Sequence, residues 1–137
     1  MRGLLQCRHD GPMLGDAPAF SGLSVDDVAA AREFYRGVLG LVVLDRDGGM
    51  LDLELAGGQR VLVYEKPDHQ PATFTVLNFS VEDVPDAVAS LTERGVRFER
   101  YEGTPVATDE DGVFRGGGPL IAWFTDPAGN VLSVVEG

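Results

Sequence analysis

Apolar positions recur along this chain with two periods, one typical of strands and one typical of helices. The same order of periods occurs twice. In residues 19–25 the apolar side chains Leu23 and Val25 stand at alternate positions, which predicts a half-buried strand. Over residues 26–40 the apolar positions return every three or four residues, as on one face of a helix. Three more alternating segments follow and are predicted to be strands: residues 41–46, 50–55 and 60–65.

The second half of the chain repeats this order. A strand is predicted at 73–81 and a helix at 83–95, and three strands are predicted at 96–101, 119–125 and 130–136. A segment rich in Gly and Asp, residues 102–118, interrupts these strands, and we call it the excursion. It is interpreted as either a solvated hairpin tip or a lid. The predicted fold class is α+β, built from two βαβββ modules.

A five-residue motif occurs at the start of each predicted helix, SVDDV at 24–28 and SVEDV at 80–84. Asp27 and Asp83 are the predicted N-caps, because a carboxylate accepts hydrogen bonds from the free N–H groups there and is favoured by the helix dipole. Gly40 and Gly95 are the predicted helix ends. The acidic pairs are therefore interpreted as capping groups and not as catalytic carboxylates.

Length and charge narrow the class of protein. The chain has 137 residues, a length typical of one domain with a hydrophobic core. Its 22 acidic and 11 basic residues give a net charge of −11. Such a surface repels phosphate backbones and anionic lipids, so we expect no nucleic-acid partner and no membrane partner. It attracts cationic ligands, although a well-solvated surface explains the same charge.

The chain is predicted to consist of a loose N-terminal extension and a single domain. Residues 1–18 are rich in Gly, Pro and charge, as such extensions are. The domain is predicted at 19–137, with modules at about 19–66 and 72–136.

The single cysteine, Cys7, excludes an internal disulfide, which suits a reducing compartment. Together with His9 and Asp10 it is interpreted as part of the extension and not as a metal site. No apolar run approaches the ~20 residues that span a bilayer, and the start of the chain lacks the long apolar region of a secretory signal. We therefore expect a cytoplasmic location.

Three segments carry a family pattern: SVDDVAAAREFYRGVLGLVV, NFSVEDVPDAVASLTERGVRF and WFTDPAGNVLSVVE. They resemble the vicinal oxygen chelate superfamily, which contains glyoxalases, bleomycin resistance proteins and extradiol dioxygenases. The resemblance runs through residues 19–136 with a gap at the excursion. It implies two βαβββ modules whose sheets curl into a half-open mixed-sheet barrel around a ligand cavity. It also implies a homodimer, because members of this superfamily commonly pair modules across a two-fold axis.

In the enzymes of the superfamily, four inward His and Glu side chains hold a divalent metal that acts as a Lewis acid. As the resemblance aligns them, these positions fall on Phe20, Tyr64, Val76 and Ser133, and Glu65 replaces Tyr64 if the register slips by one. Phenylalanine and valine have no donor atom, and serine and neutral tyrosine are poor ligands for these ions. We therefore expect that the metal site of the superfamily is absent and that the protein has no cofactor.

Alternation assigns further side chains to the expected cavity. Because Leu77 and Val81 are expected to face the helix, Phe74, Val76 and Asn78 should face the cavity. The resulting wall is mostly apolar with a few small polar groups. Such a wall favours an organic ligand over a bare cation.

Two more residues complete the candidate site. His69 lies between the modules and is interpreted either as a polar loop residue or as a ligand contact or general base at the cavity mouth. Trp123, the only tryptophan, stands opposite Ser133 on the cavity side if Thr125 pairs with Val131. It would then offer a flat aromatic surface to a ligand, and packing in the core is the alternative.

These observations predict a metal-free small-molecule-binding protein of sequestering or resistance type, with a cationic or aromatic organic ligand. The alternative is a metal-dependent lyase, isomerase or dioxygenase of the same superfamily that uses other ligands such as Glu65 and His69, and only this alternative needs a divalent metal. A third hypothesis is an interaction module whose contact surface is the excursion. The sequence identifies neither the ligand nor a reaction.

Overall fold

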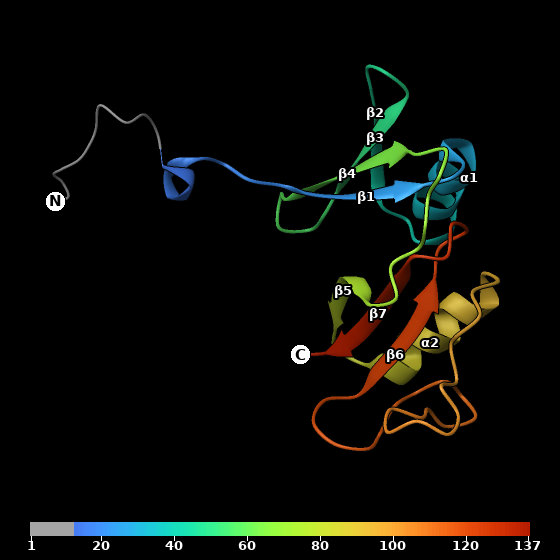
Figure 1. The fold of residues 1–137 in the computed structure, drawn as a ribbon. Helices are drawn as coiled ribbons and strands as arrows, with labels where there is room; N and C mark the ends of the chain where they lie inside the picture. The colour runs from blue at the N-terminus through green and yellow to red at the C-terminus, as the bar shows by residue number, and fades with distance from the viewer. Residues whose placement is uncertain (1–12) are drawn as a thin grey trace, which may run out of the picture.

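The structure is a computed structural model, and it describes residues 13–137. Its elements form two modules that follow one another along the chain (Figure 1). The predictions on Cys7, His9 and Asp10 lie outside the described residues. Within residues 13–137, no helix combines the length and the apolar character needed to cross a membrane.

The first module contains η1 (Leu14–Asp16), β1 (Ser21–Val25), α1 (Val28–Arg32), η2 (Glu33–Val38), β2 (Val42–Arg46), β3 (Met50–Glu54) and β4 (Arg60–Glu65). The second module contains β5 (Thr75–Val81), α2 (Val84–Glu93), β6 (Ile121–Thr125) and β7 (Val131–Glu136). The predicted α+β class is confirmed. Within the described residues the strands form two separate mixed sheets that do not close into one barrel.

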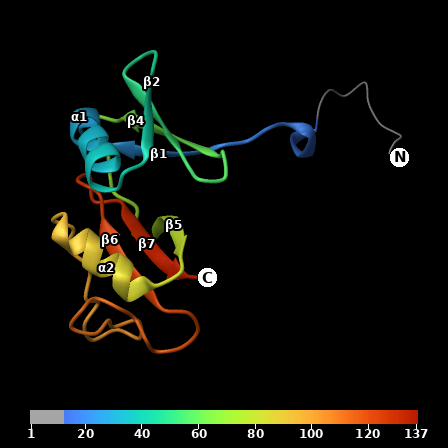
Figure 2. The ribbon, with the colours of Figure 1, turned by 180° about the vertical axis from the view of Figure 1, so that it is seen from behind.

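The first sheet has four strands in the order β1-β4-β3-β2, with β1 and β4 parallel and the other neighbours antiparallel. One of its faces packs against α1 and η2 (Figure 2). The side chains on this face are buried and apolar: Val25, Val43, Leu51, Leu53, Val61 and Val63. Each such burial stabilises the fold by roughly 1.5–3 kcal/mol. The register places Gly22, Leu44, Asp52 and Leu62 on the opposite face, which we call the open face.

The first helix ends in a π-helical turn. Its N–H groups bond five positions back, as in the 3.0 Å bond from the Leu39 N–H to the Phe34 carbonyl. This turn carries Tyr35, which is fully buried. Gly40 follows at φ +75°, a conformation that glycine adopts without strain. The predicted end of the helix at Gly40 is confirmed.

The second sheet has three strands in the order β5-β7-β6, with α2 against one face. The prediction of a strand at residues 96–101 is wrong. Phe98 makes a single isolated bridge to Phe124 of β6, and farther along β6 the excursion residue Phe114 makes another bridge to Ile121. The two segments share the outer edge of β6, so neither has enough of that edge to form a ladder.

The repeated motif caps the start of both helices through its aspartate, as predicted. Asp27 Oδ1 accepts a hydrogen bond from the Ala30 N–H at 3.1 Å. Asp83 Oδ1 accepts the equivalent bond from the Asp86 N–H at 2.9 Å. Both predicted N-caps are therefore confirmed, and the acidic pairs are part of the helix starts.

A second carboxylate reaches each helix start from the last strand of the same module. Glu65 at the end of β4 accepts a hydrogen bond from the Val28 N–H at 3.2 Å. Glu136 at the end of β7 accepts one from the Val84 N–H at 3.0 Å. The duplication thus extends to the contact between the helix and the last strand.

The two modules meet at a polar cluster that we call the module joint. It consists of the buried Tyr35, Asp126 and Asn130 and the half-buried Ser24 and His69. The Tyr35 hydroxyl donates to Asp126 Oδ2 at 2.6 Å. The Asn130 amide donates to Asp126 Oδ2 at 3.1 Å and to the Ser24 carbonyl at 2.9 Å. Burial, followed by the neighbouring Asp126 carboxylate, raises the pKa of the Tyr35 hydroxyl, so this group remains a donor. The DPAGN turn therefore connects the modules in addition to reversing the chain.

Candidate functional site

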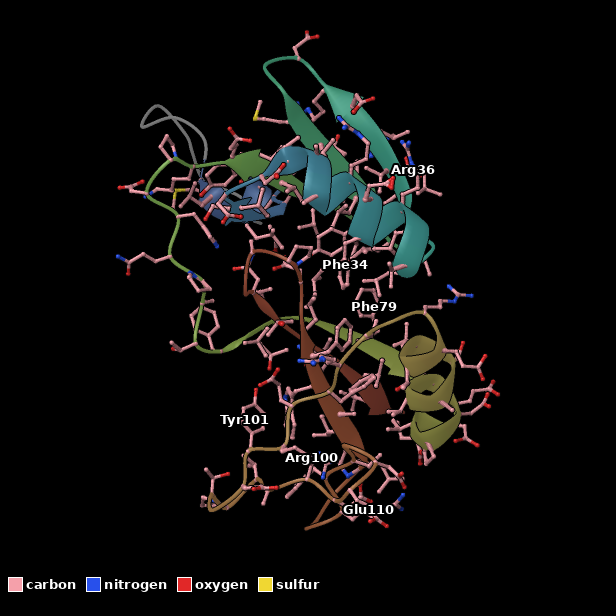
Figure 3. All side chains as sticks on the ribbon, turned by 90° about the vertical axis from the view of Figure 1, so that its right-hand side faces the viewer. Phe34, Arg36, Phe79, Arg100, Tyr101 and Glu110 are labelled. Atoms are coloured by element: carbon pink, nitrogen blue, oxygen red, sulfur yellow. The ribbon has the colours of Figure 1, made fainter. Side chains whose placement is uncertain are left out.

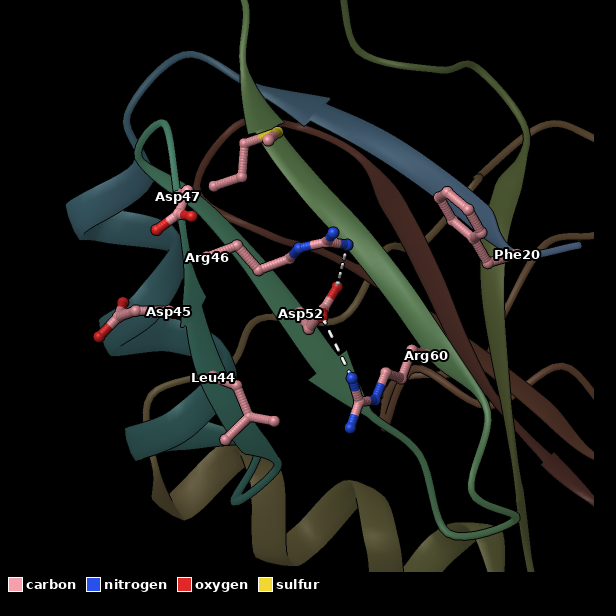
Figure 4. Close-up of a pocket in the computed structure, with 8 residues that line it drawn as sticks. Phe20, Leu44, Asp45, Arg46, Asp47, Asp52 and Arg60 are labelled. Carbon is pink, nitrogen blue, oxygen red and sulfur yellow. Dashed lines mark hydrogen bonds and ion pairs between the residues drawn. The ribbon is translucent and has the colours of Figure 1, made fainter.

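The open face of the first sheet is hollowed by a cavity of about 630 Å³ (Figure 4). This volume lies within the ~300–1,000 Å³ typical of small-molecule pockets. The lining residues are Phe20, Leu44, Asp45, Arg46, Asp47, Met50, Asp52 and Arg60. All of them belong to the first half of the chain, so the first module builds this cavity by itself.

The floor of the cavity is a carboxylate between two guanidinium groups. Asp52 lies at the centre of β3, between Leu44 of β2 and Leu62 of β4, and its side chain is only 8% exposed. Arg46 Nη1 lies 3.4 Å from Asp52 Oδ1, and Arg60 Nη1 lies 3.6 Å from Asp52 Oδ2. Because a buried carboxylate without such partners is strongly destabilising, the two arginines allow Asp52 to occupy this position.

Apolar side chains form the rest of the cavity wall. Phe20 is 68% exposed and Leu44 is 38% exposed, and Met50 is half-buried. Figure 4 shows Phe20 and Leu44 on opposite sides of Asp52. The cavity therefore combines apolar surfaces with a charged floor, an arrangement that suits a ligand with an apolar body and a polar group.

Tyr64 lies on the open face, but it is not among the residues that line the cavity. It pairs with Ser24 of β1, as expected for the aligned register. The alternative register, in which Glu65 would replace Tyr64, is wrong. Glu65 pairs with Val25, which faces the helix, and the Glu65 carboxylate accepts a hydrogen bond from the Val28 N–H at the start of that helix. Glu65 is therefore directed away from the open face.

The corresponding face of the second sheet carries Asn78, Ser133 and Trp123 side by side. The predicted register is confirmed, since Ser133 pairs with Asn78 and with Trp123 while Thr125 pairs with Val131. Ser133 is fully buried, and its hydroxyl donates to Asn78 Oδ1 at 2.6 Å. These three residues form a second surface, separate from the cavity, and their contact with a ligand stays a prediction.

Aromatic side chains from the excursion and from the residue before it cover Trp123. The ring centres of Tyr101 and Phe114 lie 5.4 Å and 6.0 Å from that of Trp123. Tyr101 has φ +50°, a strained conformation for a residue other than glycine, and burial raises the pKa of its hydroxyl. Figure 3 shows Tyr101 at the border between the second sheet and the excursion. Phe114 thus packs the excursion against Trp123, and a lid over the cavity stays a prediction.

Phe74 and Val76 do not follow the alternation from which they were predicted to face the cavity. A β-bulge lies between Thr75 and Leu77, so that strict alternation stops at this point. Val76 packs against the core, and Phe74 precedes β5 and is 69% exposed. Neither of the two lines the cavity of the first module.

His69 belongs to the module joint. Its Nδ1 lies 2.7 Å from the Ser24 hydroxyl, and its Nε2 lies 3.0 Å from the Ala128 carbonyl. Both ring nitrogens are therefore engaged by protein groups. This arrangement supports the interpretation of His69 as a polar loop residue, because a ligand would have to replace one of these two partners.

The family of the chain follows from comparison with known proteins. Residues 18–134 match the family model described as the Glyoxalase/Bleomycin resistance protein/Dioxygenase superfamily. The chain belongs to this superfamily. The resemblance found in the sequence is thereby confirmed. No curated protein matches the chain.

Solved structures of the superfamily share the fold. A glyoxalase family protein from Enterococcus faecalis is 26% identical, with a TM-score of 0.63 and coverage of 90% of this chain and 100% of that chain. TnmS3, an antibiotic binding protein from Streptomyces sp. CB03234, is 26% identical, with a TM-score of 0.62 and coverage of 88% and 97%. A lactoylglutathione lyase from Agrobacterium tumefaciens is 23% identical, with a TM-score of 0.60 and coverage of 89% and 94%, and this likeness shows the fold alone.

The donor set does not fit the metal that enzymes of the superfamily hold. Phe20 and Val76 offer only carbon, and the Ser133 hydroxyl is bonded to Asn78. Tyr64 would be left as a single phenol ligand, which does not hold these ions. Among residues 13–137, no three His, Cys, Asp or Glu side chains are grouped so that they could bind a metal.

The charged floor of the cavity was not predicted from the sequence. Alternation in MLDLEL does place Asp52 opposite the buried leucines, and this is the available signal. That Arg46 and Arg60 converge on Asp52 depends on the register of three strands. Only the assembled sheet provides this information.

Proposed function

We propose that the protein binds a small organic molecule in the cavity of the first module without a metal ion, as a sequestering or resistance-type protein. The main support is a cavity of about 630 Å³ that joins an apolar wall to the Arg46–Asp52–Arg60 floor. Phe20 stands where the resemblance places a metal ligand of the superfamily's enzymes, and its side chain has no donor atom. Such a cavity holds a ligand by packing and hydrogen bonds, which is what sequestration requires.

The likeness to TnmS3 supports the same proposal. That protein is described as an antibiotic binding protein, and the two chains are 26% identical over 88% of this chain. Binding of an antibiotic is therefore a function that this fold performs in a similar chain. The alternative for this chain, a metal-dependent lyase, isomerase or dioxygenase, would need a donor set that residues 13–137 do not present.

Binding can be measured with N-phenyl-1-naphthylamine, a neutral aromatic probe whose fluorescence rises in apolar surroundings. We expect saturable binding to protein dialysed against a chelator, with one equivalent of probe per chain. Leu44→Trp should weaken this binding by about tenfold or more, equivalent to about 1.4 kcal/mol, because the larger side chain fills the cavity. The readout is a fluorescence titration.

A matched control is Leu91→Trp. Leu91 lines a separate apolar hollow of about 280 Å³ between the modules, beside Phe79 (Figure 3), so this variant should leave the titration unchanged. Elemental analysis accompanies the titration. Stoichiometric zinc, iron, nickel or manganese, together with loss of probe binding after chelation, would contradict the proposal and favour the metal-dependent alternative.

We also propose that the chain forms a homodimer, in keeping with the superfamily. Phe20, Val42 and Leu44 are 68%, 54% and 38% exposed, and by register Val42 and Leu44 lie on the open face of the first sheet. Val42 and Leu44 are neighbours on one face of the edge strand β2, and adjacent exposed apolar side chains are typical of surfaces that a partner covers. The interface would then border the cavity.

Val42→Asp tests the dimer. A carboxylate at the centre of such an interface would be buried without a partner, so we expect a monomer in light scattering coupled to size-exclusion chromatography, where the wild-type protein is a dimer. Val106→Asp is the control, because Val106 is 40% exposed in the excursion and far along the chain from this face. A wild-type monomer at micromolar concentration would refute the proposed assembly.

A further inference from the structure

The floor of the cavity has unused hydrogen-bonding capacity. A guanidinium has five N–H donors, and it pairs best with a carboxylate at about 2.7–2.9 Å. Arg46 approaches Asp52 through one nitrogen at 3.4 Å, and Arg60 does so at 3.6 Å, with a second nitrogen on Glu54 at 3.1 Å. Asp52 therefore orients the two guanidinium groups toward each other without saturating either of them.

The carboxylates near the cavity do not all face the two arginines of its floor. Asp45 is engaged by Arg32 at 2.8 Å, and in Figure 4 the carboxylates of Asp45 and Asp47 point away from the space between the two cavity arginines. Two carboxylates pair with the two guanidinium groups, because Asp52 contacts both arginines and Glu54 lies 3.1 Å from Arg60. In a protein with a net charge of −11, the charges of Arg46 and Arg60 are thus balanced locally, and their exposed N–H groups remain available to an anion.

The arginines are also accessible to a ligand. The side chains of Arg46 and Arg60 are 46% and 53% exposed, whereas that of Asp52 is 8% exposed. A ligand entering the cavity therefore meets the guanidinium groups before the carboxylate. The apolar side chains of Phe20 and Leu44 stand beside them.

We infer that the cavity takes amphipathic anions, namely molecules with an aromatic body and one carboxylate or sulfonate group held between Arg46 and Arg60. The inference rests on the proposed function and specifies the class of its ligand. It differs from the cationic ligand that the net charge of the sequence favoured, because binding depends on the charges within reach of the ligand. Asp52 acts as a positioning residue for the two arginines.

Two probes with the same skeleton test this inference. One is 8-anilinonaphthalene-1-sulfonate, and the other is N-phenyl-1-naphthylamine, which lacks the sulfonate. The measured quantity is the ratio of their dissociation constants, neutral probe over anionic probe, for each protein. In the double variant Arg46→Gln with Arg60→Gln, we expect this ratio to fall by about tenfold or more, while the affinity for the neutral probe stays close to that of the wild type.

Arg97→Gln with Arg100→Gln is the matched control. It makes the same change in net charge at two arginines that do not line the cavity, so the ratio should remain at its wild-type value. If the double cavity variant is unstable because Asp52 is left unpaired, adding Asp52→Asn removes that buried charge, and the same fall in the ratio is expected.

The outcomes separate the inference from the proposed function. An equal ratio in the wild type and the cavity variants overturns the inference and leaves the proposed function standing, provided that the neutral probe still binds. An equal fall in the control variant also overturns it, because the effect would then belong to the overall charge. The proposed function fails as well if the wild-type protein binds neither probe, or if Leu44→Trp weakens the binding of neither.

Discussion

Asp126→Ala should lower the free energy of unfolding by about 4 kcal/mol, the largest effect that we expect from a single substitution. Asp126 is 3% exposed and accepts hydrogen bonds from the Tyr35 hydroxyl, the Asn130 side chain and the N–H groups of Ala128 and Asn130. Alanine leaves these donors without the carboxylate, and the Asn130 amide keeps only its bond to the Ser24 carbonyl. Urea unfolding followed by circular dichroism measures the loss.

Two variants show whether the loss comes from the module joint. Asp126→Asn keeps one acceptor oxygen and should lose about half as much stability. Asp68→Ala removes an exposed carboxylate and should leave the urea midpoint unchanged. A loss below about 1 kcal/mol for Asp126→Ala would show that the modules are held together mainly by apolar contacts such as that of Phe34 with Phe124.

Stability should fall steeply above pH 10 because of Tyr35. Burial and the Asp126 carboxylate raise the pKa of its hydroxyl above the ordinary value of 10.0, so the unfolded chain loses this proton at a lower pH than the folded chain. The free energy of unfolding then falls as the pH rises, by about 1.4 kcal/mol per pH unit above pH 10 and about 3 kcal/mol by pH 12. Below pH 10 this group contributes no pH dependence.

Tyr35→Phe isolates this contribution. The variant should be less stable than the wild type at pH 8, because Asp126 loses one donor, and it should then lose less stability between pH 10 and 12. Tyr64→Phe, at a tyrosine outside the module joint, is the control and should keep the wild-type slope. Parallel slopes for the wild type and Tyr35→Phe would refute the assignment. Urea titrations at pH 8, 10, 11 and 12 provide the data.

Those parts of the fold that depend on neighbouring residues could be predicted from the sequence. The N-caps Asp27 and Asp83 bond to groups three positions away, and Gly40 ends its helix through its own backbone angle. The two-residue period of a strand separates the faces of β1 and β4, and the resemblance aligned Tyr64 with the face that is open in the structure. Residues 96–101 have the same period, but competition with the excursion for the edge of β6 prevents a strand there.

Some features of the candidate site could be predicted from the sequence, and others depend on residues far apart in the chain. The absence of donor atoms at Phe20 and Val76 is a property of the residues themselves. The Trp123–Ser133 pairing needed only the short DPAGN turn to set its register, and it was predicted. The role of His69 depends on Ser24 and Ala128, which lie 45 and 59 positions away in the chain.

The sequence by itself determined the two modules and the helix starts, because these depend on local hydrogen bonds and on the period of apolar positions. The superfamily came from the resemblance of three of its segments. Only the tertiary structure decided that Tyr35 meets Asp126 across 91 positions and that Arg46 and Arg60 converge on Asp52. These contacts depend on how strands and modules are placed against one another. That placement results from the packing of the whole core, so the net charge of −11 gave no indication of the two arginines on the cavity floor.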